Sequence, residues 1–203
     1  MKKILNFTIF VVLSFLFAGL IGCGIKVDCP EFDEGILSWL PYQKNDVIEL
    51  YSQSKDSTIT FSINIVEITH KTHYTIGTKC GTCDDYIIMN SAYNTSNFKV
   101  DIRLNKNKIE RQDYQIIDTF FEEHNTIYSE LRNYKFENDE YDIVRVFEKT
   151  DSRGTFKKLI IAKDIGIIGL VDIHGNTWTL LKPEVKIRRL NEREGVVINN
   201  VGC

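Results

Sequence analysis

The chain has 203 residues, of which 25 are lysine or arginine, 28 are aspartate or glutamate, and 43% are hydrophobic. This length is sufficient for one domain with a sizeable core. The slightly acidic balance excludes a general nucleic-acid binder, which needs a basic face. We therefore expect one folded domain that does not bind nucleic acid.

The first 22 residues have the layout of an export signal. Met1 is followed by Lys2 and Lys3, then by an apolar run over 4–21 with only three polar interruptions, and small residues precede Cys23. A positively charged start, an apolar middle and small residues at the cleavage end are typical of a secretory signal. The alternative is an uncleaved transmembrane helix. It is weaker because about 18 apolar residues lie at the lower limit of what spans a bilayer.

The tetrapeptide Leu-Ile-Gly-Cys at 20–23 resembles the lipobox of bacterial lipoproteins. The resemblance implies that the Cys23 thiol is alkylated with diacylglycerol, that the chain is cut before Cys23, and that the new amine is acylated. Two or more acyl chains give stable membrane anchoring. We expect a lipoprotein signal peptide over 1–22, a lipid-anchored tether over 23–32 and a single β-rich domain over 33–203. Removing 1–22, which carries two lysines and no acid, leaves 23 basic residues against 28 acidic ones.

Two further stretches are similar to small uncharacterised lipoproteins of Bacteroidetes-type bacteria. One is 29–50, with its Trp-Leu-Pro-Tyr step, and the other is 160–180, with its glycine-punctuated apolar run. The resemblance implies an envelope location and a fold, and it carries no catalytic residue. The stretch Gly24–Asp28 lacks the acidic run of surface-exported members, which favours an outer-membrane anchor that faces the periplasm.

Most of the chain shows the patterns of β-strands. Apolar residues alternate with polar ones over 59–65 and 98–104, and the alternation changes phase after Ile65, which indicates a bulge or the end of a strand. Further strands are expected at 47–51, 141–147, 156–162, 167–173 and 178–181. Short turns between consecutive strands predict an antiparallel meander.

Residues 111–134 fit two interpretations. Their apolar side chains recur every three or four residues, as in a helix, but threonine and tyrosine also suit strands. We favour strands because the neighbouring segments are strands, and keep one helix as the alternative. The fold class is then mainly β, an antiparallel meander that forms a sandwich or a partly open barrel. The runs 159–162 and 167–171 lack polar residues and are expected to be covered on both faces.

Four cysteines remain once Cys23 is assigned to the lipid: Cys29, Cys80, Cys83 and Cys203. Four cysteines in an exported protein predict two disulfides, with three pairings open. Cys80 and Cys83 are three apart, so a disulfide across a turn is geometrically allowed. Pairing of either one with Cys29 or Cys203 is equally open.

The pair Cys80-Gly-Thr-Cys83 also has the spacing of a thiol-redox motif. Such motifs lie at a helix N-terminus within a βαβ unit, which the sequence does not predict here. Asp84 and Asp85 follow directly, and nearby negative charge disfavours a thiolate. We therefore expect structural disulfides.

His70 and His73 could complete a zinc ligand set with Cys80 and Cys83. Residues three apart on a strand point to opposite faces, and an oxidising compartment consumes thiols. We expect no cofactor and no metal. A metal-binding or thiol-redox protein that uses these four residues is the alternative.

Catalytic motifs are missing from the sequence. It contains no Gly-x-Ser-x-Gly elbow, no phosphate-binding glycine loop and no His-Glu-x-x-His. The cluster Glu122-Glu123-His124 is more typical of exposed residues at the end of an element. We expect a lipid-anchored binding or structural module of the cell envelope and not an enzyme. Its partners are the membrane, through the anchor, and an unidentified protein or small molecule.

Overall fold

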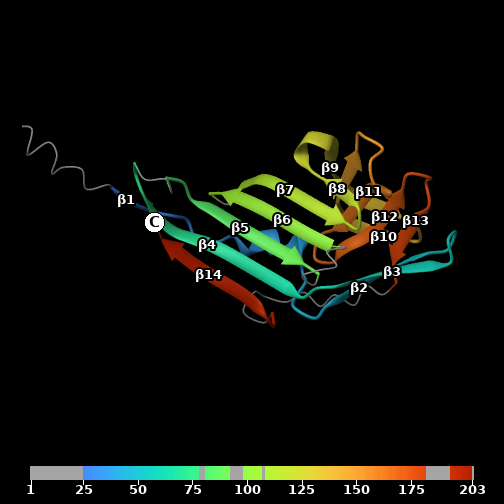
Figure 1. The fold of residues 1–203 in the computed structure, drawn as a ribbon, viewed down its shortest axis with the longest axis horizontal. Coiled ribbons are helices and arrows are strands. Elements are labelled where there is room, and N and C mark those ends of the chain that lie inside the picture. The colour runs from blue at the N-terminus through green and yellow to red at the C-terminus, as the bar shows by residue number, and fades with distance from the viewer. Residues whose placement is uncertain (1–24, 78–80, 92–97, 107, 182–192, 203) are drawn as a thin grey trace, which may run out of the picture.

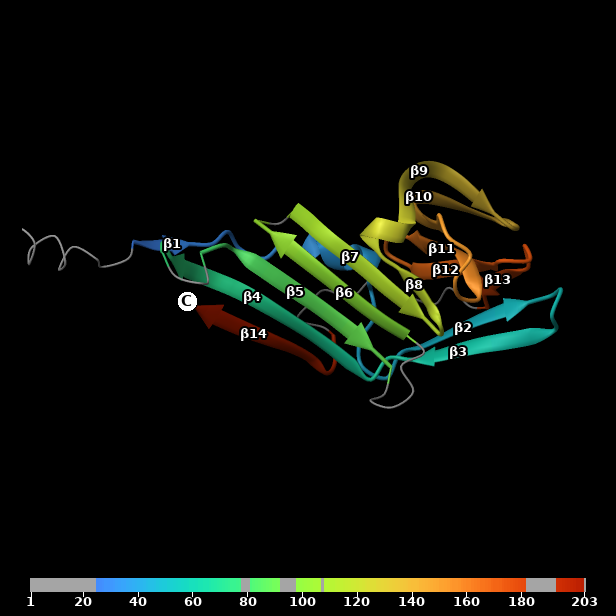
Figure 2. The ribbon, with the colours of Figure 1, turned by 45° about the horizontal axis from the view of Figure 1, so that its top comes forward.

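The described residues form two β-sheets of seven strands each, in a sandwich-like arrangement that does not close into a barrel (Figures 1 and 2). The computed structural model describes residues 25–77, 81–91, 98–106, 108–181 and 193–202. The expectation of a mainly β fold is confirmed, and of the two predicted architectures the sandwich is the correct one.

The first sheet, here called sheet A, is a meander with two additional strands. Its path runs β1 (Lys26–Asp28), β4 (Ile65–Thr75), β5 (Asp84–Asn90), β6 (Phe98–Asn105), β7 (Lys108–Ile116) and β8 (Thr119–Phe121). Consecutive strands from β4 to β8 are antiparallel, as expected. The exception is β14 (Val196–Gly202), which pairs with β4 in parallel. The sequence patterns did not predict this last strand, which lies outside the meander.

The second sheet, sheet B, contains the strands predicted in the C-terminal half. Its order is β3 (Ser57–Ser62), β2 (Val47–Ser52), β13 (Thr177–Leu180), β12 (Gly166–Asp172), β11 (Phe156–Ala162), β10 (Asp139–Lys149) and β9 (Thr126–Phe136). The strands β9 to β13 are antiparallel neighbours in sequence order. The β2–β3 hairpin joins them through β13, far along the chain.

Residues 111–134 form strands, so the favoured interpretation is confirmed and the helix alternative is wrong. They belong to β7, β8 and β9, and the only helical element there is the three-residue 3-10 turn η2 (Glu123–Asn125). Ile117 has φ 55°, which ends β7 in a tight turn. This turn and η2 interrupt the alternation, and the interruptions produced the helix-like spacing. Among the described residues no helix has the length and apolar character needed to cross a membrane.

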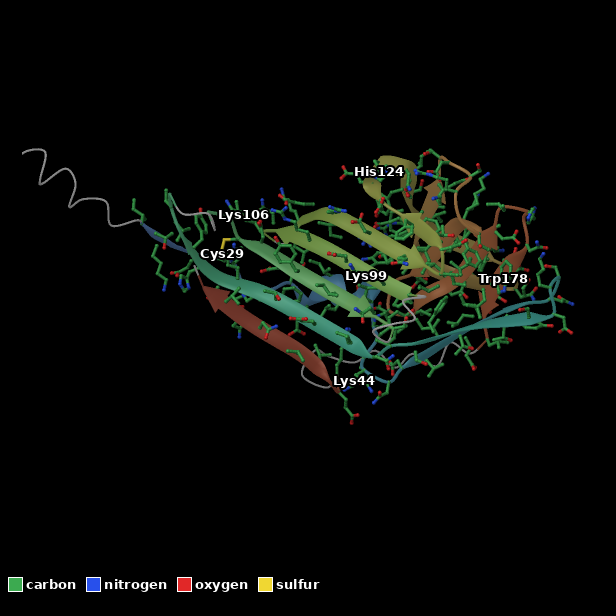
Figure 3. All side chains as sticks on the ribbon, in the orientation of Figure 1. Cys29, Lys44, Lys99, Lys106, His124 and Trp178 are labelled. Atoms are coloured by element: carbon green, nitrogen blue, oxygen red, sulfur yellow. A yellow bond between two sulfur atoms is a disulfide. The ribbon has the colours of Figure 1, made fainter. Side chains whose placement is uncertain are left out.

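Side chains from both sheets fill the space between them. Alternate residues of β6, beginning with Phe98, are buried, as the period of two predicts. Trp178 packs edge-on against Phe156 at a centroid distance of 5.4 Å, while Lys99 projects from sheet A (Figure 3). The 3-10 helix η1 (Glu34–Trp39) also buries Ile36, Leu37 and Trp39.

Strands β11 and β12 are covered on both faces, which confirms the expectation for their uninterrupted apolar runs. Leu159 and Ile161 belong to the main core, whereas Ile160 and Ala162 belong to a second, smaller core on the outer face of sheet B. The β9–β10 hairpin covers this second core. Asn133 has φ 50° and no ladder partner, so β9 bends there, and the Phe136 ring lies against Gly169.

The N-terminal end of the described chain belongs to sheet A. Lys26–Asp28 lie within the predicted 23–32 tether, yet they pair with Thr75, Tyr74 and His73 of β4. The tether prediction is corrected accordingly, because part of this stretch is a strand of the domain. Only residues 24 and 25 separate Cys23 from β1.

Candidate functional site

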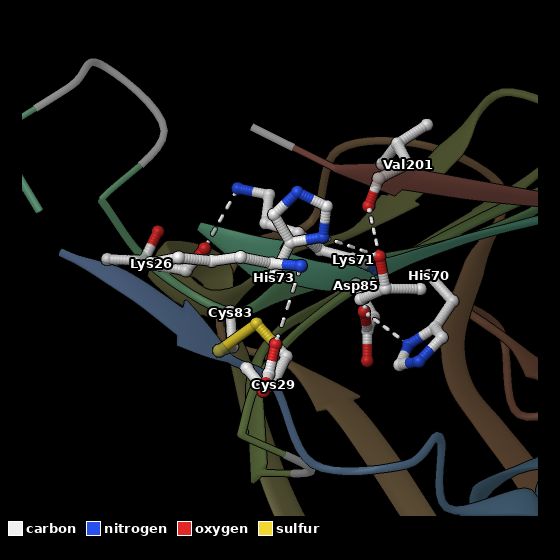
Figure 4. The surroundings of a disulfide bond; sticks show 11 residues. Lys26, Cys29, His70, Lys71, His73, Cys83, Asp85 and Val201 are labelled. Carbon is white, nitrogen blue, oxygen red and sulfur yellow. Dashed lines mark hydrogen bonds and ion pairs between the residues drawn. A yellow bond between two sulfur atoms is a disulfide. The ribbon is translucent and has the colours of Figure 1, made fainter. Parts of the chain in front are cut away.

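Two of the four cysteines predicted to form disulfides lie within the described residues, and these two are bonded to each other. Cys29 and Cys83 form a disulfide, with their Cα atoms 5.5 Å apart (Figure 4). The redox and zinc alternatives both need a Cys83 thiolate, whereas this sulfur is bonded to Cys29. Cys23, Cys80 and Cys203 lie outside the described residues, so lipidation of Cys23 and a second disulfide stay predictions.

The disulfide lies at a junction between two strands. Asp28 of β1 pairs with His73, and Tyr86 of β5 pairs with Thr69, so β1 and β5 follow one another along the same edge of β4. Cys29 follows β1 directly, and Cys83 directly precedes β5. The covalent bond therefore joins the two strands end to end. We call this junction the β1–β5 seam.

A buried carboxylate completes the β1–β5 seam where the backbone ladder is interrupted. Asp85 Oδ1 accepts a hydrogen bond of 2.8 Å from the Lys71 N–H and lies 3.0 Å from His70 Nδ1 (Figure 4). The Asp85 side chain is only 5% exposed. Lys71 pairs with Val201 of β14 on one edge of β4 and has no ladder partner in β1 or β5 on the other. Asp85 substitutes for a partner on that second edge, since a buried backbone N–H without an acceptor is costly.

The two predicted histidine ligands do not converge. His70 faces Asp85 and also contacts the Phe32 ring edge-on at 6.0 Å, whereas His73 Nδ1 lies 3.1 Å from Thr72 Oγ1. Their separation of three residues on β4 directs the two rings apart, as expected for a strand. Within the described ranges, no three histidine, cysteine, aspartate or glutamate side chains are grouped to hold a metal ion.

A cleft of about 570 Å³ lies between the two sheets, next to β7 of sheet A and to β9 and β10 of sheet B. The sequence patterns did not predict it. Sheet A contributes Lys108–Gln112 of β7, and sheet B contributes Tyr128, Arg145 and Phe147. Ile36, Glu122, Glu123 and Thr126 complete the lining. We call it the inter-sheet cleft. Its volume lies in the range of pockets that bind small ligands.

The inter-sheet cleft follows the edge of β7 and not its face. Successive side chains of a strand point to opposite faces, so a cavity over one face would contact only every second residue. The cleft contacts all five residues from Lys108 to Gln112. Among the described strands, β8 is the one on this edge, and it pairs with Tyr114–Ile116, so no described strand pairs with Lys108–Gln112 there. Backbone amide and carbonyl groups of β7 are thus available to a ligand.

Arg145 is the most unusual group of the cleft, because it occupies an inward position of β10 and is only 13% exposed. Its Cζ lies 3.8 Å from the centroid of the Trp39 ring and 5.8 Å from that of Tyr128. Its Nε donates to Glu130 Oε2 at 3.3 Å. Its Nη1 is buried and has no hydrogen-bond partner among the described residues. A planar guanidinium held on an indole face is preorganised to bind an acceptor.

Aromatic rings line the sheet B side of the cleft. Phe147 lies 5.4 Å from Tyr128 and 5.0 Å from the buried Tyr114, measured between ring centroids. Burial raises the pKa of Tyr114, whose hydroxyl accepts a hydrogen bond from the Gln112 side chain. Burial also raises the pKa of Tyr128. Both phenols are therefore neutral donors and acceptors at neutral pH, not ionised groups.

The charged residues of the cleft are balanced. Lys108, Arg111 and Arg145 are opposed by Glu110, Glu122 and Glu123. The cluster Glu122-Glu123-His124, expected to be exposed, contributes its two glutamates to the lining, whereas His124 is 69% exposed. A lining with balanced charges does not select strongly for the net charge of a ligand. Specificity then depends on the individual side chains that line the cleft, Arg145 among them.

Comparisons with protein-family models, with curated proteins and with solved structures found no match to this chain. The assignment of a site therefore depends on the geometry alone. The residues that sequence reasoning selected form the β1–β5 seam, and the residues that it missed form the inter-sheet cleft. One signal was present: Arg145 stands between Ile143 and Phe147 in an alternating strand, at a position where the pattern requires an apolar residue.

Proposed function

We propose that the chain is a lipid-anchored protein of the cell envelope, acylated at Cys23 and held at the outer membrane facing the periplasm. We further propose that it is a binding module whose ligand site is the inter-sheet cleft. The export signal and the lipobox-like sequence at 20–23 support the anchor. A disulfide within the domain is consistent with an oxidising compartment.

The observation that carries the binding proposal is the guanidinium of Arg145, whose Nη1 is buried without a hydrogen-bond partner among the described residues. A buried N–H donor without an acceptor is costly unless a ligand or a partner satisfies it. Trp39 and Glu130 fix the guanidinium in position, but Nη1 has no acceptor from the described chain. A structural role alone would be served better by an apolar residue, which the neighbouring positions Ile143 and Phe147 illustrate.

The cleft indicates the chemistry of its ligand. A suitable ligand carries an oxygen acceptor for Arg145 and a flat apolar part that packs against Tyr128 and Phe147. The open edge of β7 adds backbone donors and acceptors for polar groups on the other side. This combination of an apolar wall with a few placed polar groups is typical of ligand sites.

Native mass spectrometry of protein extracted from membranes in mild detergent tests the binding proposal. We expect a bound species on the wild type and on Arg153→Gln, and none on Arg145→Gln. Arg153 is the matched control because its side chain is 76% exposed and pairs with Asp151 away from the cleft lining. A bound species that is retained on Arg145→Gln, or is missing from the wild type, would contradict the proposal.

The anchor has a separate test, so that the two parts of the proposal can fail independently. Replacing Cys23 by serine should abolish lipid attachment, release the protein from the membrane fraction and leave the signal uncleaved by the lipoprotein peptidase. Intact mass measurement of both proteins checks this. An identical lipid mass and identical membrane fractionation in Cys23→Ser would refute the anchor.

A further inference from the structure

Strand β9 forms one border of sheet B and leaves a long backbone edge open. It pairs with β10 and, within the described part of the chain, with no other strand. Ile127 is 60% exposed and Leu131 is 40% exposed on the outer face. An exposed strand edge with apolar side chains is a template for pairing with another strand.

The open edge has a definite length. The bend at Asn133 turns the end of β9 over the outer face of sheet B, where Phe136 packs against Gly169. Thr126–Arg132 is consequently the regular part of the edge. This segment contains no proline, no lysine and no residue with positive φ, which are devices that block edge pairing in other sheets. Its two charged residues, Glu130 and Arg132, face Tyr128 and Thr126 of the second copy in the pairing proposed below.

We propose that Thr126–Arg132 pairs antiparallel with the same segment of a second copy of the chain, about a twofold axis at Ser129. In this register Ile127 faces Leu131 of the second copy on the outer face, and the same contact recurs on the other side of the axis. On the inner face Tyr128 faces Glu130 of the second copy. Such a self-complementary contact closes into a dimer.

The side chains of Thr126–Arg132 favour a second copy of the chain as the partner, and they favour the register about Ser129. The Ile127–Leu131 contacts bring four exposed apolar side chains into one patch. The Tyr128 hydroxyl already donates to Glu130 within one chain, at 3.1 Å, so the facing pair repeats a compatible donor and acceptor. An axis at Glu130 would place two like charges directly opposite each other, which is destabilising. An axis at Leu131 would require the bent residues after Arg132.

Cysteine cross-linking in the full chain tests the register. Directly paired residues have Cα atoms about 4.5–5.5 Å apart, within the range that a disulfide spans. Ser129→Cys should therefore form a covalent dimer under mild oxidation. The matched control is Ser57→Cys, an exposed serine on β3 at the opposite edge of sheet B. It should give no more dimer than the wild type, whose own cysteines set the background.

Mass measurement in solution tests the interface without a cross-link. Wild type and Ile173→Lys should be dimers, whereas Leu131→Lys should be a monomer with an unchanged circular dichroism spectrum. Ile173 is the control because it is 46% exposed and lies outside β9. A monomeric wild type, equal cross-linking of Ser129→Cys and Ser57→Cys, or cross-linking of Ser129→Cys only to other envelope proteins would each overturn the proposal. The tested positions Ser129 and Leu131 do not line the inter-sheet cleft, although Thr126 and Tyr128 of the same segment do.

Discussion

The β1–β5 seam and the β9 edge belong to different sheets, in opposite halves of the molecule, and differ in how their strand edges are treated (Figure 1). At the seam, the edge of β4 is covered by two strands in succession, and the interruption is closed by a disulfide and the Asp85 carboxylate. At β9, seven residues of regular strand present an edge with which no other described strand pairs. The comparison shows that the edge of β4 is reinforced next to the N-terminal strand of the domain, whereas the edge of β9 is left available for pairing with another strand.

The largest effect should follow from opening the seam. The bond joins residues 54 apart, and the chain-entropy relation assigns about 4 kcal/mol of unfolding free energy to a loop of this size. Cys29→Ser, Cys83→Ser and the double variant should all lose this amount, because they remove the same bond. Denaturant unfolding followed by circular dichroism measures it. A double variant that loses twice as much as each single variant would show that the bond is not the cause.

The next effect concerns the bend that limits the β9 edge. Phe136→Ala removes the ring that covers the second core of sheet B and should lower the unfolding free energy by about 3 kcal/mol. Phe120→Ala is the control, since Phe120 is 45% exposed and should cost far less. Equal losses in the two variants would contradict the role assigned to the bend.

A smaller effect is expected from the carboxylate of the seam. Asp85→Ala leaves the Lys71 N–H without its acceptor and should cost about 1–2 kcal/mol. Hydrogen exchange at the Lys71 amide should accelerate more than exchange at the Phe98 amide in β6. The control Asp101→Ala removes a half-exposed carboxylate of the same sheet. Unchanged exchange at Lys71 would mean that the carboxylate does not complete the ladder.

The smallest effect is a pH dependence near the start of β9. Hydrogen bonds from Lys149, and then from Arg153, lower the pKa of Asp151 from 3.8 to about 2. Since the folded pKa is below the unfolded one, the stabilisation is complete above about pH 4 and is lost as the pH falls towards 2. Asp151→Asn should flatten the stability profile between these values. A slope equal to that of the wild type would contradict this assignment.

Much of the fold follows from local patterns in the sequence. The alternation over 98–104 predicts β6, and the phase change near Ile65 marks the break between β3 and β4. The uninterrupted apolar runs of β11 and β12 predict burial on both faces. These successes share one cause: burial imposes a period of two on each strand, and the period is visible without knowledge of its neighbours.

Long-range pairing could not be predicted in the same way. Nothing local indicates that β2 pairs with β13, or that β14 returns to β4 in parallel. The choice of Cys29 as the partner of Cys83 depends on β1 and β5 sharing an edge, which is a property of the folded sheet. The stacking of Arg145 on Trp39 joins residues on different elements, so the candidate site was hidden for the same reason.

The Cys29–Cys83 bond also determines how the domain carries mechanical load. Strand β1 contributes only three ladder pairs, which a pull on the N-terminus would break one after another. With the bond present, the force passes through Cys83 into β5, whose ladders with β4 and β6 must shear together. The disulfide thus transfers tension from a three-residue strand of sheet A to the interior of the sheet.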